Sequence, residues 1–260
     1  MNILDMFSLK GKTALVTGGA GLYGRQIVAA LAEAGAETYI ASRNIDALEK
    51  IASEHRNAGY NVKALRFNQK DENSALAMRD EIKRQSNQLD VLVNNAVARP
   101  MKGYEDDVSA FAESMEVNAT GLFIITRAMG DFMSETRGGS IINVGSIMGM
   151  IGPDPENYKG TSMNAWYPDY FFHKGGMINF TRFTASYYGD KGIRCNCISP
   201  GGLYQPSMPE AFVENYNSRT FLRRLANETD LKGIIVFLAS DASVYITGTN
   251  IPVDGGYTAK

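Results

Sequence analysis

Short apolar segments alternate along the chain with longer segments in which apolar residues recur at helical spacing. The apolar segments predict buried strands at 12–17, 37–42, 62–67, 89–93, 140–144 and 194–198. The segments between them predict helices after residue 21, over 45–58 and 74–85, along a stretch that contains 111–125, and over 170–188. Strands that alternate with helices form βαβ units, whose parallel sheet is covered by helices on both faces. We therefore expect an α/β fold with a doubly wound parallel sheet.

A single domain should account for residues 1–260. The sequence contains no internal repeat, low-complexity tract or linker, and 260 residues are enough to bury a large core. A polar insert at about 150–168, which contains three prolines, precedes the last predicted helix. We expect this insert to lie on the substrate side of the domain.

Charge and cysteine content narrow the classes of partner. The 26 basic and 28 acidic residues give a formal charge of −2 and are scattered, so we expect no nucleic-acid partner. No apolar run approaches the roughly 18 residues that span a bilayer, and the first residues lack the pattern of a secretory signal. Cys195 and Cys197 point the same way from a predicted strand, which indicates buried thiols rather than a disulfide or a metal site. We expect a cytoplasmic protein with no membrane contact and no metal.

The main candidate for chemistry is a tyrosine and a lysine four residues apart in the helix predicted at 170–188. At this spacing Tyr170 and Lys174 share one helix face, where the ammonium favours the phenolate and lowers the pKa of the phenol. Such a phenol can give a proton to a carbonyl oxygen, or take one from an alcohol, while a hydride moves at carbon. Ser146 could hold and polarise the same oxygen. The pair alone also fits two ordinary helix residues, so the other motifs decide between the two interpretations.

A glycine-rich turn follows the first predicted strand. Gly19, Gly21 and Gly24 fit the pattern G-x-G-x-x-G, and Gly18 precedes them. Glycines let the backbone approach a diphosphate, and a helix that begins there presents free N–H groups and the positive end of its dipole. The alternative is a glycine-rich turn that binds no ligand. Its position between a strand and a helix favours a dinucleotide site.

Six motifs in this order resemble the single-domain branch of the short-chain dehydrogenase/reductase family over essentially the whole chain. They are Thr17-Gly18 with the later glycines, Asn94-Asn95-Ala96, Asn118, the set Ser146, Tyr170 and Lys174, Asn196 with Pro200-Gly201, and Pro252-Val253-Asp254-Gly255-Gly256. The resemblance implies a Rossmann fold and hydride transfer between a nicotinamide cofactor and a carbon that bears a hydroxyl or carbonyl group. It implies that Tyr170 is the proton donor or acceptor and that Ser146 bonds the substrate oxygen. Lys174 would lower the pKa of the phenol and orient ribose, and Asn118 would position a water in the proton relay.

The same resemblance implies the cofactor contacts. They involve Gly18, Gly19, Gly21, Leu22, Tyr23, Gly24, Asn68, Gln69, Asn95, Ala96, Lys174, Pro200 and Gly201. After the second predicted strand, Ser42 and Arg43 stand where an acidic residue would select NAD. A hydroxyl and a guanidinium suit the 2′-phosphate of NADP. We predict a preference for NADP; the alternative is that Arg43 stacks on adenine and that NAD is also used.

Two features depart from the family pattern. The glycine spacing T-G-x-x-G-x-x-G resembles the larger branch that acts on nucleotide sugars, which raises an epimerase or dehydratase as an alternative. The chain has no room for that branch's C-terminal substrate domain, and Asn94-Asn95-Ala96 also argues against it. The gap of 24 positions between Ser146 and Tyr170 is longer than usual and contains the rival phenols Tyr158 and Tyr167. Neither rival has a lysine four residues later, so Tyr170 is the predicted proton donor.

The insert bears on the substrate. It is polar and aromatic and contains Trp166, the only tryptophan, and such a surface suits a sugar or polyol. Within the family, the layout resembles bacterial sugar, polyol and sugar-acid dehydrogenases such as gluconate 5-dehydrogenase. Arg99, Lys102 and His173 lie near motifs that should border the pocket and could hold an acidic group. The alternatives for the insert are a solvated excursion or a subunit contact.

Two other functions fit the sequence. A 3-oxoacyl carrier-protein reductase shares the motifs and should show a basic docking patch near the pocket mouth. A non-catalytic NADP-binding regulatory protein would need no phenol beside a lysine, which the intact catalytic set argues against. The family usually forms tetramers, and residues 246–257 resemble its C-terminal contact segment. We therefore predict a homotetramer that acts on a small-molecule substrate.

Overall fold

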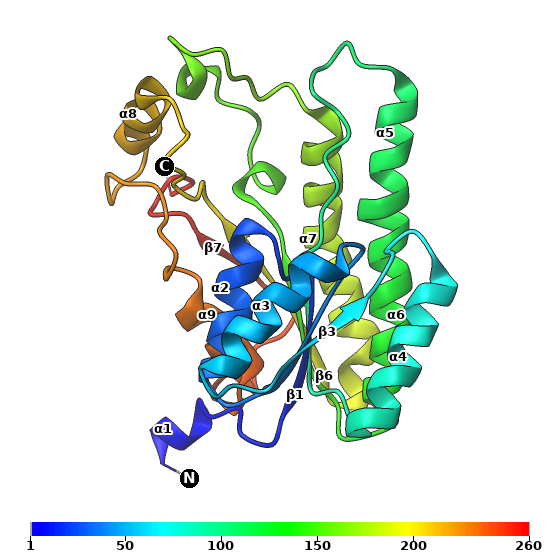
Figure 1. Cartoon of the computed structure of the whole chain (residues 1–260). Helices are drawn as coiled ribbons and strands as arrows, with labels where there is room; N and C mark the ends of the chain where they lie inside the picture. The colour runs from blue at the N-terminus through cyan, green and yellow to red at the C-terminus, as the bar shows by residue number, and fades with distance from the viewer. Residues whose placement is uncertain (1, 260) are drawn as a thin grey trace.

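The computed structural model describes residues 2–259 and contains a seven-stranded parallel sheet (Figure 1). The strands are β1 (Thr13–Thr17), β2 (Glu37–Ser42), β3 (Val62–Arg66), β4 (Val91–Asn94), β5 (Gly139–Val144), β6 (Ile193–Pro200) and β7 (Asn250–Val253). They lie in the order β3-β2-β1-β4-β5-β6-β7, so the chain winds outward from β1 in one direction and from β4 in the other. The doubly wound Rossmann sheet predicted from the sequence is confirmed.

Helices cover both faces of this sheet. The α-helices are α1 (Ile3–Met6), α2 (Leu22–Glu33), α3 (Ile45–Asn57), α4 (Glu72–Ser86), α5 (Val108–Met115), α6 (Gly121–Ser134), α7 (Pro168–Tyr188), α8 (Glu210–Arg219) and α9 (Lys232–Ala239). Shorter turns are the π-helical η1 (Glu116–Thr120) and the 3₁₀ helices η2 (Ile147–Gly149), η3 (Pro155–Tyr158), η4 (Gly189–Lys191) and η5 (Asp241–Ser243). Helices α2, α3 and α9 pack on one face, and α4, α6 and α7 pack on the other (Figure 1).

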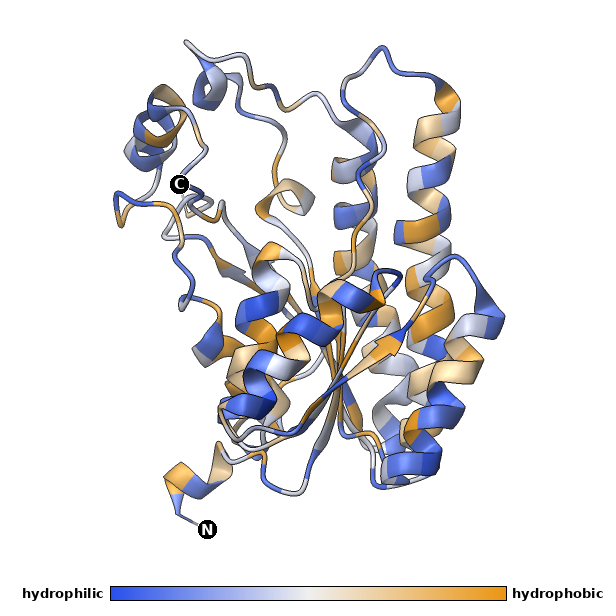
Figure 2. Ribbon diagram, viewed as in Figure 1, coloured by the Kyte–Doolittle hydropathy of each residue, from blue (hydrophilic) through white to orange (hydrophobic). Residues whose placement is uncertain are grey.

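Each face of the sheet has its own apolar core. Ile27, Leu48 and Ile235 are fully buried in the first, and Ile125 and Met129 are fully buried in the second. Figure 2 shows apolar strands between helices whose outward faces are largely hydrophilic. A parallel sheet that is covered on both sides requires such continuous apolar strands, which is why the sequence identified them.

Four helices and strands lie outside the sequence prediction, namely α1, α8, α9 and β7. Strand β7 is short and contains Pro252, which argues against a strand in the interior of a sheet. Because β7 pairs only with β6 at the edge, the missing N–H of this proline leaves no neighbouring strand without a donor. Helix α8 is mostly polar, and its buried residues are Phe212 and Tyr216.

The long helix expected around 111–125 is interrupted. Helix α5 continues through the π-helical turn η1 into α6, and Asn118 lies within that turn. A π-helical turn adds a residue to the helical repeat, frequently at functional sites, and apolar periodicity does not reveal it. Gly121 follows directly, where an added Cβ would lie 2.5 Å from the carbonyl oxygen of Gln69. The close approach of these two segments therefore requires glycine.

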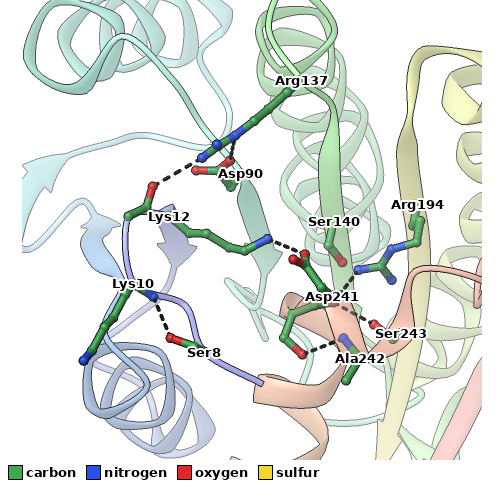
Figure 3. A network of polar contacts seen from close by, with 12 residues as sticks. Ser8, Lys10, Lys12, Asp90, Arg137, Ser140, Arg194, Asp241, Ala242 and Ser243 are labelled. Carbon is green, nitrogen blue, oxygen red and sulfur yellow. Dashed lines mark hydrogen bonds and ion pairs between the residues drawn. The ribbon is translucent and has the colours of Figure 1, made fainter. Parts of the chain in front are cut away.

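The amino ends of the strands carry a network of polar contacts that ties the loops together (Figure 3). Asp90 accepts hydrogen bonds from the backbone N–H of Thr13 at 2.7 Å and from Nε of Arg137 at 2.8 Å. Lys12 forms an ion pair with Asp241 at 2.7 Å, and Arg194 donates to the carbonyl of Leu238 at 2.8 Å. This network stabilises the edge of the sheet opposite the candidate site. Within residues 2–259, no helix combines the length and the apolar character that a membrane span requires.

Candidate active site

A cleft of about 920 Å³ opens at the carboxyl ends of the strands. Twelve of the predicted site residues line it: Gly18, Gly21, Leu22, Tyr23, Ser42, Asn95, Ala96, Ser146, Tyr170, Lys174, Pro200 and Gly201. The carboxyl edge of a doubly wound sheet is where ligands bind in this architecture, because the loops after neighbouring strands converge there. The fold thus brings the glycine turn after β1 and the start of α7 into one space.

Lys174 is held rigidly behind the cleft. Its side chain is buried, and its Nζ donates a 2.5 Å hydrogen bond to the carbonyl oxygen of Val144, the last residue of β5. The same nitrogen lies 5.8 Å from the centre of the Tyr170 ring. Burial lowers the pKa of Lys174, and the negative potential of the neighbouring Tyr170 opposes that shift. The helix spacing therefore places the two groups together as predicted.

The phenol of Tyr170 has a pKa below its ordinary value. Burial alone would raise this pKa, but the positive charges of Lys174 and Arg99 and hydrogen bonds with Ser146 and Arg99 prevail. The guanidinium carbon of Arg99 lies 4.5 Å from the centre of the Tyr170 ring. The hydroxyl of Ser146 also caps η2, where it accepts a 3.2 Å hydrogen bond from the N–H of Met148. A phenol with this environment can exchange a proton near neutral pH more readily than an isolated tyrosine.

Asn118 is fixed by the backbone next to the cleft. Its side-chain amide donates to the carbonyl of Ala98 at 2.8 Å and accepts from the N–H of Ala98 at 2.9 Å. It also donates to the hydroxyl of Ser114 at 3.0 Å. The π-helical turn thus anchors the loop that carries Arg99. The water relay expected for Asn118 stays a prediction, because the structure gives this side chain a positioning role.

The glycine turn has the shape that a diphosphate requires. Gly18 has a φ of +69°, and an added Cβ would lie 2.8 Å from Cα of Ala96. A Cβ on Gly24 would lie 2.2 Å from the carbonyl oxygen of Gly18, so neither position accepts a side chain. Helix α2 begins here after Gly21, and no side chain caps its free N–H groups. The residues present therefore fit the diphosphate of a dinucleotide.

Two side chains connect this turn to the neighbouring loops. The hydroxyl of Tyr23 donates a 2.7 Å hydrogen bond to the carbonyl of Gly201, so the start of α2 is tied to the segment after β6. The amide of Asn95 donates to the carbonyl oxygens of Thr17 at 3.1 Å and Gly18 at 2.9 Å. These three hydrogen bonds close the cleft around the space where a dinucleotide would lie.

Some predicted residues lie off the cleft lining. Gly19 and Gly24 lie behind the turn, and the exposed Arg43 does not reach the lining although Ser42 does. Gln69 uses its side chain elsewhere, because its amide donates to the carbonyl of Val117 at 2.9 Å. Asn68 accepts a hydrogen bond from the N–H of Lys70 at 3.3 Å. Cofactor contacts by Arg43, Asn68 and Gln69 remain predictions.

The insert packs against α8 and borders the cleft. Asp154 forms a 3.0 Å ion pair with Arg219, and the amide of Asn215 donates to the carbonyl of Lys159 at 2.9 Å. The rings of Tyr158 and Phe212 are centred 5.5 Å apart. The insert therefore has a packed partner within the chain and is not a purely solvated excursion.

The lining differs from the expectation for the substrate end of the cleft. Arg99, Lys102, Tyr158 and Tyr167 line it, whereas Trp166 is 51% exposed and does not. His173 is also absent from the lining, and burial together with the charges of Lys174 and Arg99 lowers its pKa to about 3. It is therefore neutral and offers no cation to an acidic group. Several lining residues were not predicted from the sequence, including Met101, Asp169, Phe212 and Tyr216. Only the position of Asp169 directly before Tyr170 could have pointed to it.

Comparison with known proteins identifies the family. A family model described as enoyl-(acyl carrier protein) reductase matches residues 21–258. The chain belongs to the short-chain dehydrogenase/reductase family. Its similarity to 2-dehydro-3-deoxy-D-gluconate 5-dehydrogenase of Pseudoalteromonas atlantica is 31% identity over 99% of this chain and 100% of that protein. NADP-dependent mannitol dehydrogenase of Hypocrea jecorina is 32% identical, with 99% and 96% of the two chains covered.

Solved structures give the same assignment. A gluconate 5-dehydrogenase from Burkholderia cenocepacia, in complex with NADP and tartrate, superposes with a TM-score of 0.90 at 27% identity and full coverage of both chains. An NAD⁺-bound xylitol dehydrogenase superposes with a TM-score of 0.87 at 26% identity over 95% of this chain and 99% of that one. The expected family, its fold and the expected class of enzyme, an oxidoreductase acting on CH–OH groups, are thereby confirmed.

Proposed function

We propose that this oxidoreductase transfers a hydride between NADP and a secondary alcohol or ketone of a sugar, polyol or sugar acid. The observation that carries the proposal is the phenol of Tyr170, which lies on the cleft lining between two cations, Lys174 and Arg99. Such an arrangement serves proton transfer to or from an oxygen atom.

The residues of the chain divide the work between them. When bound, a nicotinamide nucleotide supplies the hydride donor or acceptor, and the glycine turn with Asn95, Pro200 and Gly201 would hold it. Tyr170 would give its proton to the carbonyl oxygen during reduction and accept it during oxidation. Ser146 would hold the same oxygen by a hydrogen bond. The buried ammonium of Lys174 stabilises the phenolate that forms when Tyr170 gives its proton to the substrate oxygen, so less negative charge develops on that oxygen.

Several observations support a preference for NADP. Ser42 lines the cleft at the end of β2, and the next residue is Arg43 rather than an acid. A carboxylate at this place would repel a 2′-phosphate, whereas a hydroxyl can donate a hydrogen bond to it. The related gluconate 5-dehydrogenase structure contains NADP, and the related mannitol dehydrogenase is named for it. A lower KM for NAD than for NADP would contradict this preference.

The substrate class follows from the charge of the lining. Arg99, beside Tyr170, and Lys102 place positive groups on the cleft lining, which suits an acidic or polyhydroxylated substrate. Relatives named for gluconate derivatives and for mannitol support this class. The second candidate is a 3-oxoacyl carrier-protein reductase, because the enzyme of that name from Thermotoga maritima is 30% identical over 95% of this chain and 98% of that protein. A non-catalytic regulator is a third candidate, and it would bind NADP without turnover.

One panel of substrates separates these candidates. Aldonic acids, ketoses, polyols and acetoacetyl thioesters are each supplied with NADP or NAD, in oxidised or reduced form, and nicotinamide absorbance is followed. Turnover of a polyol or sugar acid with NADP is the expected result. Turnover of thioesters alone would favour the carrier-protein reductase, and cofactor binding without any turnover would favour the regulator.

We also propose a cytoplasmic homotetramer. Phe172, Phe183 and Tyr187 on α7 and Phe123 on α6 are exposed although they are large and apolar. Such a patch on neighbouring helices is typical of a subunit contact. The exposed Val244 and Tyr245, next to the segment at 246–257, could add a second contact. The two buried free thiols, Cys195 and Cys197, support a reducing compartment.

A further inference from the structure

We propose that Asp169 accepts a hydrogen bond from a second hydroxyl group of the substrate, so that the enzyme selects alcohols that carry more than one hydroxyl. This inference rests on the proposed function and narrows its substrate class. It begins with a buried carboxyl group. Asp169 lies in the first turn of α7, directly before Tyr170, and is only 2% exposed, yet it lines the cleft.

The carboxyl oxygen Oδ1 of Asp169 is without a partner. This atom is buried and receives no hydrogen bond from any residue in the described range 2–259. A buried acceptor that has exchanged water for no other donor destabilises the fold, and nearly all such groups in proteins have a partner. Asp169 is a lining residue, so a ligand that occupies the cleft lies beside it and can supply the missing donor.

The start of the helix does not explain this side chain. A negative charge in a first turn is favoured by the helix dipole, which helps to tolerate Asp169 there. However, an acid that caps a helix accepts a backbone hydrogen bond, and Oδ1 accepts none among the described residues. The helix dipole therefore accounts for an acidic residue at this position but does not explain why its Oδ1 accepts no hydrogen bond among the described residues.

The chemistry of the missing donor follows from the surroundings. Arg99, Lys102 and Lys174 already place positive charge on the lining, so a cationic substrate is disfavoured and a neutral hydroxyl fits. Consecutive residues of a helix do not face one another, so Asp169 and Tyr170 contact different atoms of the substrate. Tyr170 would bond the reacting oxygen, and Asp169 would bond a hydroxyl on another carbon. A fatty acyl chain offers no donor to this oxygen, which favours polyols and sugar acids over acyl thioesters.

The test compares substrates that differ in one hydroxyl. The alcohol with the highest kcat/KM in the panel and its monodeoxy analogues are assayed with wild type, Asp169→Ala and Asp169→Asn. Asp190→Asn is the matched control, because Asp190 is exposed just beyond the other end of α7 and lies off the cleft lining. Circular dichroism and NADP binding by fluorescence establish that each variant is folded and loaded.

We expect wild type to prefer the parent alcohol over one deoxy analogue by about 100-fold or more, because a site built for a hydroxyl rejects the analogue that lacks it. Asp169→Ala should lower kcat/KM for the parent alcohol by about 10- to 100-fold. It should leave kcat/KM for that deoxy analogue within about threefold of the wild-type value. The kcat/KM of Asp169→Asn for the parent alcohol should lie between those of wild type and Asp169→Ala. The control Asp190→Asn should match wild type on every substrate. The inference is overturned if Asp169→Ala lowers kcat/KM equally for the parent and its analogues, or if wild type uses all of them with equal kcat/KM. Either result leaves the proposed function intact. No turnover of any alcohol in the panel overturns both.

Discussion

Tyr170 has two cationic neighbours rather than the single one that its spacing from Lys174 indicates. Lys174 follows four residues later on the same helix, and local geometry alone predicts that the two lie together. Arg99 comes from the loop after β4 and reaches the ring only because β4, β5 and α7 converge in the folded chain. The sequence places Arg99 near the pocket, but its contact with the phenol depends on tertiary structure. The same holds for Asp169, whose burial no local pattern indicates.

The contact between Arg99 and Tyr170 has a consequence for pH dependence. Alcohol oxidation needs the phenolate, so kcat should rise with pH through the lowered pKa of Tyr170, with a midpoint below the reference value of about 10. Replacing Arg99 by Met removes a positive charge that stabilises the phenolate, and the midpoint should rise by about one pH unit. The measurement is kcat for oxidation between pH 6 and 11 under saturating substrate.

Lys102→Met serves as the matched control for this profile. Lys102 lines the same cleft, but its ammonium donates to the carbonyl of Arg99 at 3.0 Å, and it is not among the groups that shift the pKa of Tyr170. Its midpoint should follow that of wild type. Superimposable profiles for Arg99→Met and wild type would show that the guanidinium does not act on the phenol.

At the scale of elements, the polar network at the amino ends of the strands connects parts of the chain that are distant in sequence. Asp90, before β4, holds the first residue of β1 through the N–H of Thr13 and the loop before β5 through Arg137 (Figure 3). The carboxyl group is 5% exposed, so its loss leaves a buried N–H without an acceptor.

Asp90→Ala should therefore lower the free energy of unfolding by about 2–3 kcal/mol while kcat/KM at 25 °C changes less than twofold. Urea denaturation at a fixed protein concentration measures the loss. Asp241→Ala removes the more exposed ion pair with Lys12 and should cost less than about 1 kcal/mol. If the two variants lost the same free energy of unfolding, the buried carboxyl group of Asp90 would not stabilise the fold more than the exposed ion pair does.

The elements differ in how well their sequences reveal them. The five inner strands, β1, β2, β4, β5 and β6, are mostly buried, because helices cover both faces of the sheet, and their short apolar runs are readily recognised. Strand β7 contains Pro252 and lies at an edge of the sheet, so it is not a continuous apolar run. Helix α8 buries only Phe212 and Tyr216, so it lacks a longer series of apolar residues at regular helical spacing. The π-helical turn η1 leaves no mark on hydrophobic periodicity, although it fixes Asn118 beside the loop of Arg99.

For the whole molecule, the order of motifs was sufficient to predict the fold, the family and the place of the cleft. Doubly wound sheets bind ligands where the strand order reverses, so motifs after β1, β4, β5 and β6 necessarily meet there. The substrate end could not be predicted in the same way, because it is assembled from the insert, α8 and the loop after β4. Their arrangement depends on long-range contacts such as Asp154 with Arg219.

The proposed tetramer makes a prediction at this scale. Phe183 is exposed on α7, and its ring lies between those of Phe180 and Tyr187, with centres 6.2 and 6.1 Å apart. Phe183→Glu would bury a charge in an apolar subunit contact and should convert tetramers into smaller species at micromolar concentration. Light scattering after gel filtration measures the mass. Tyr104→Glu, at an exposed position off these helices, should remain tetrameric. A wild-type monomer would refute the proposed assembly itself.

The most direct measurement of the central claim compares two tyrosines of the same cleft. Tyr170→Phe removes only a hydroxyl and should lower kcat on the best substrate of the panel by about 100- to 10,000-fold, with NADP affinity within about threefold of wild type. Tyr158→Phe is the control, because burial raises the pKa of that phenol to about 12 and no lysine lies four residues later. It should keep kcat within about tenfold of wild type. If Tyr170→Phe retained most of the wild-type kcat, or if Tyr158→Phe lost as much, Tyr170 would not be the group that transfers the proton.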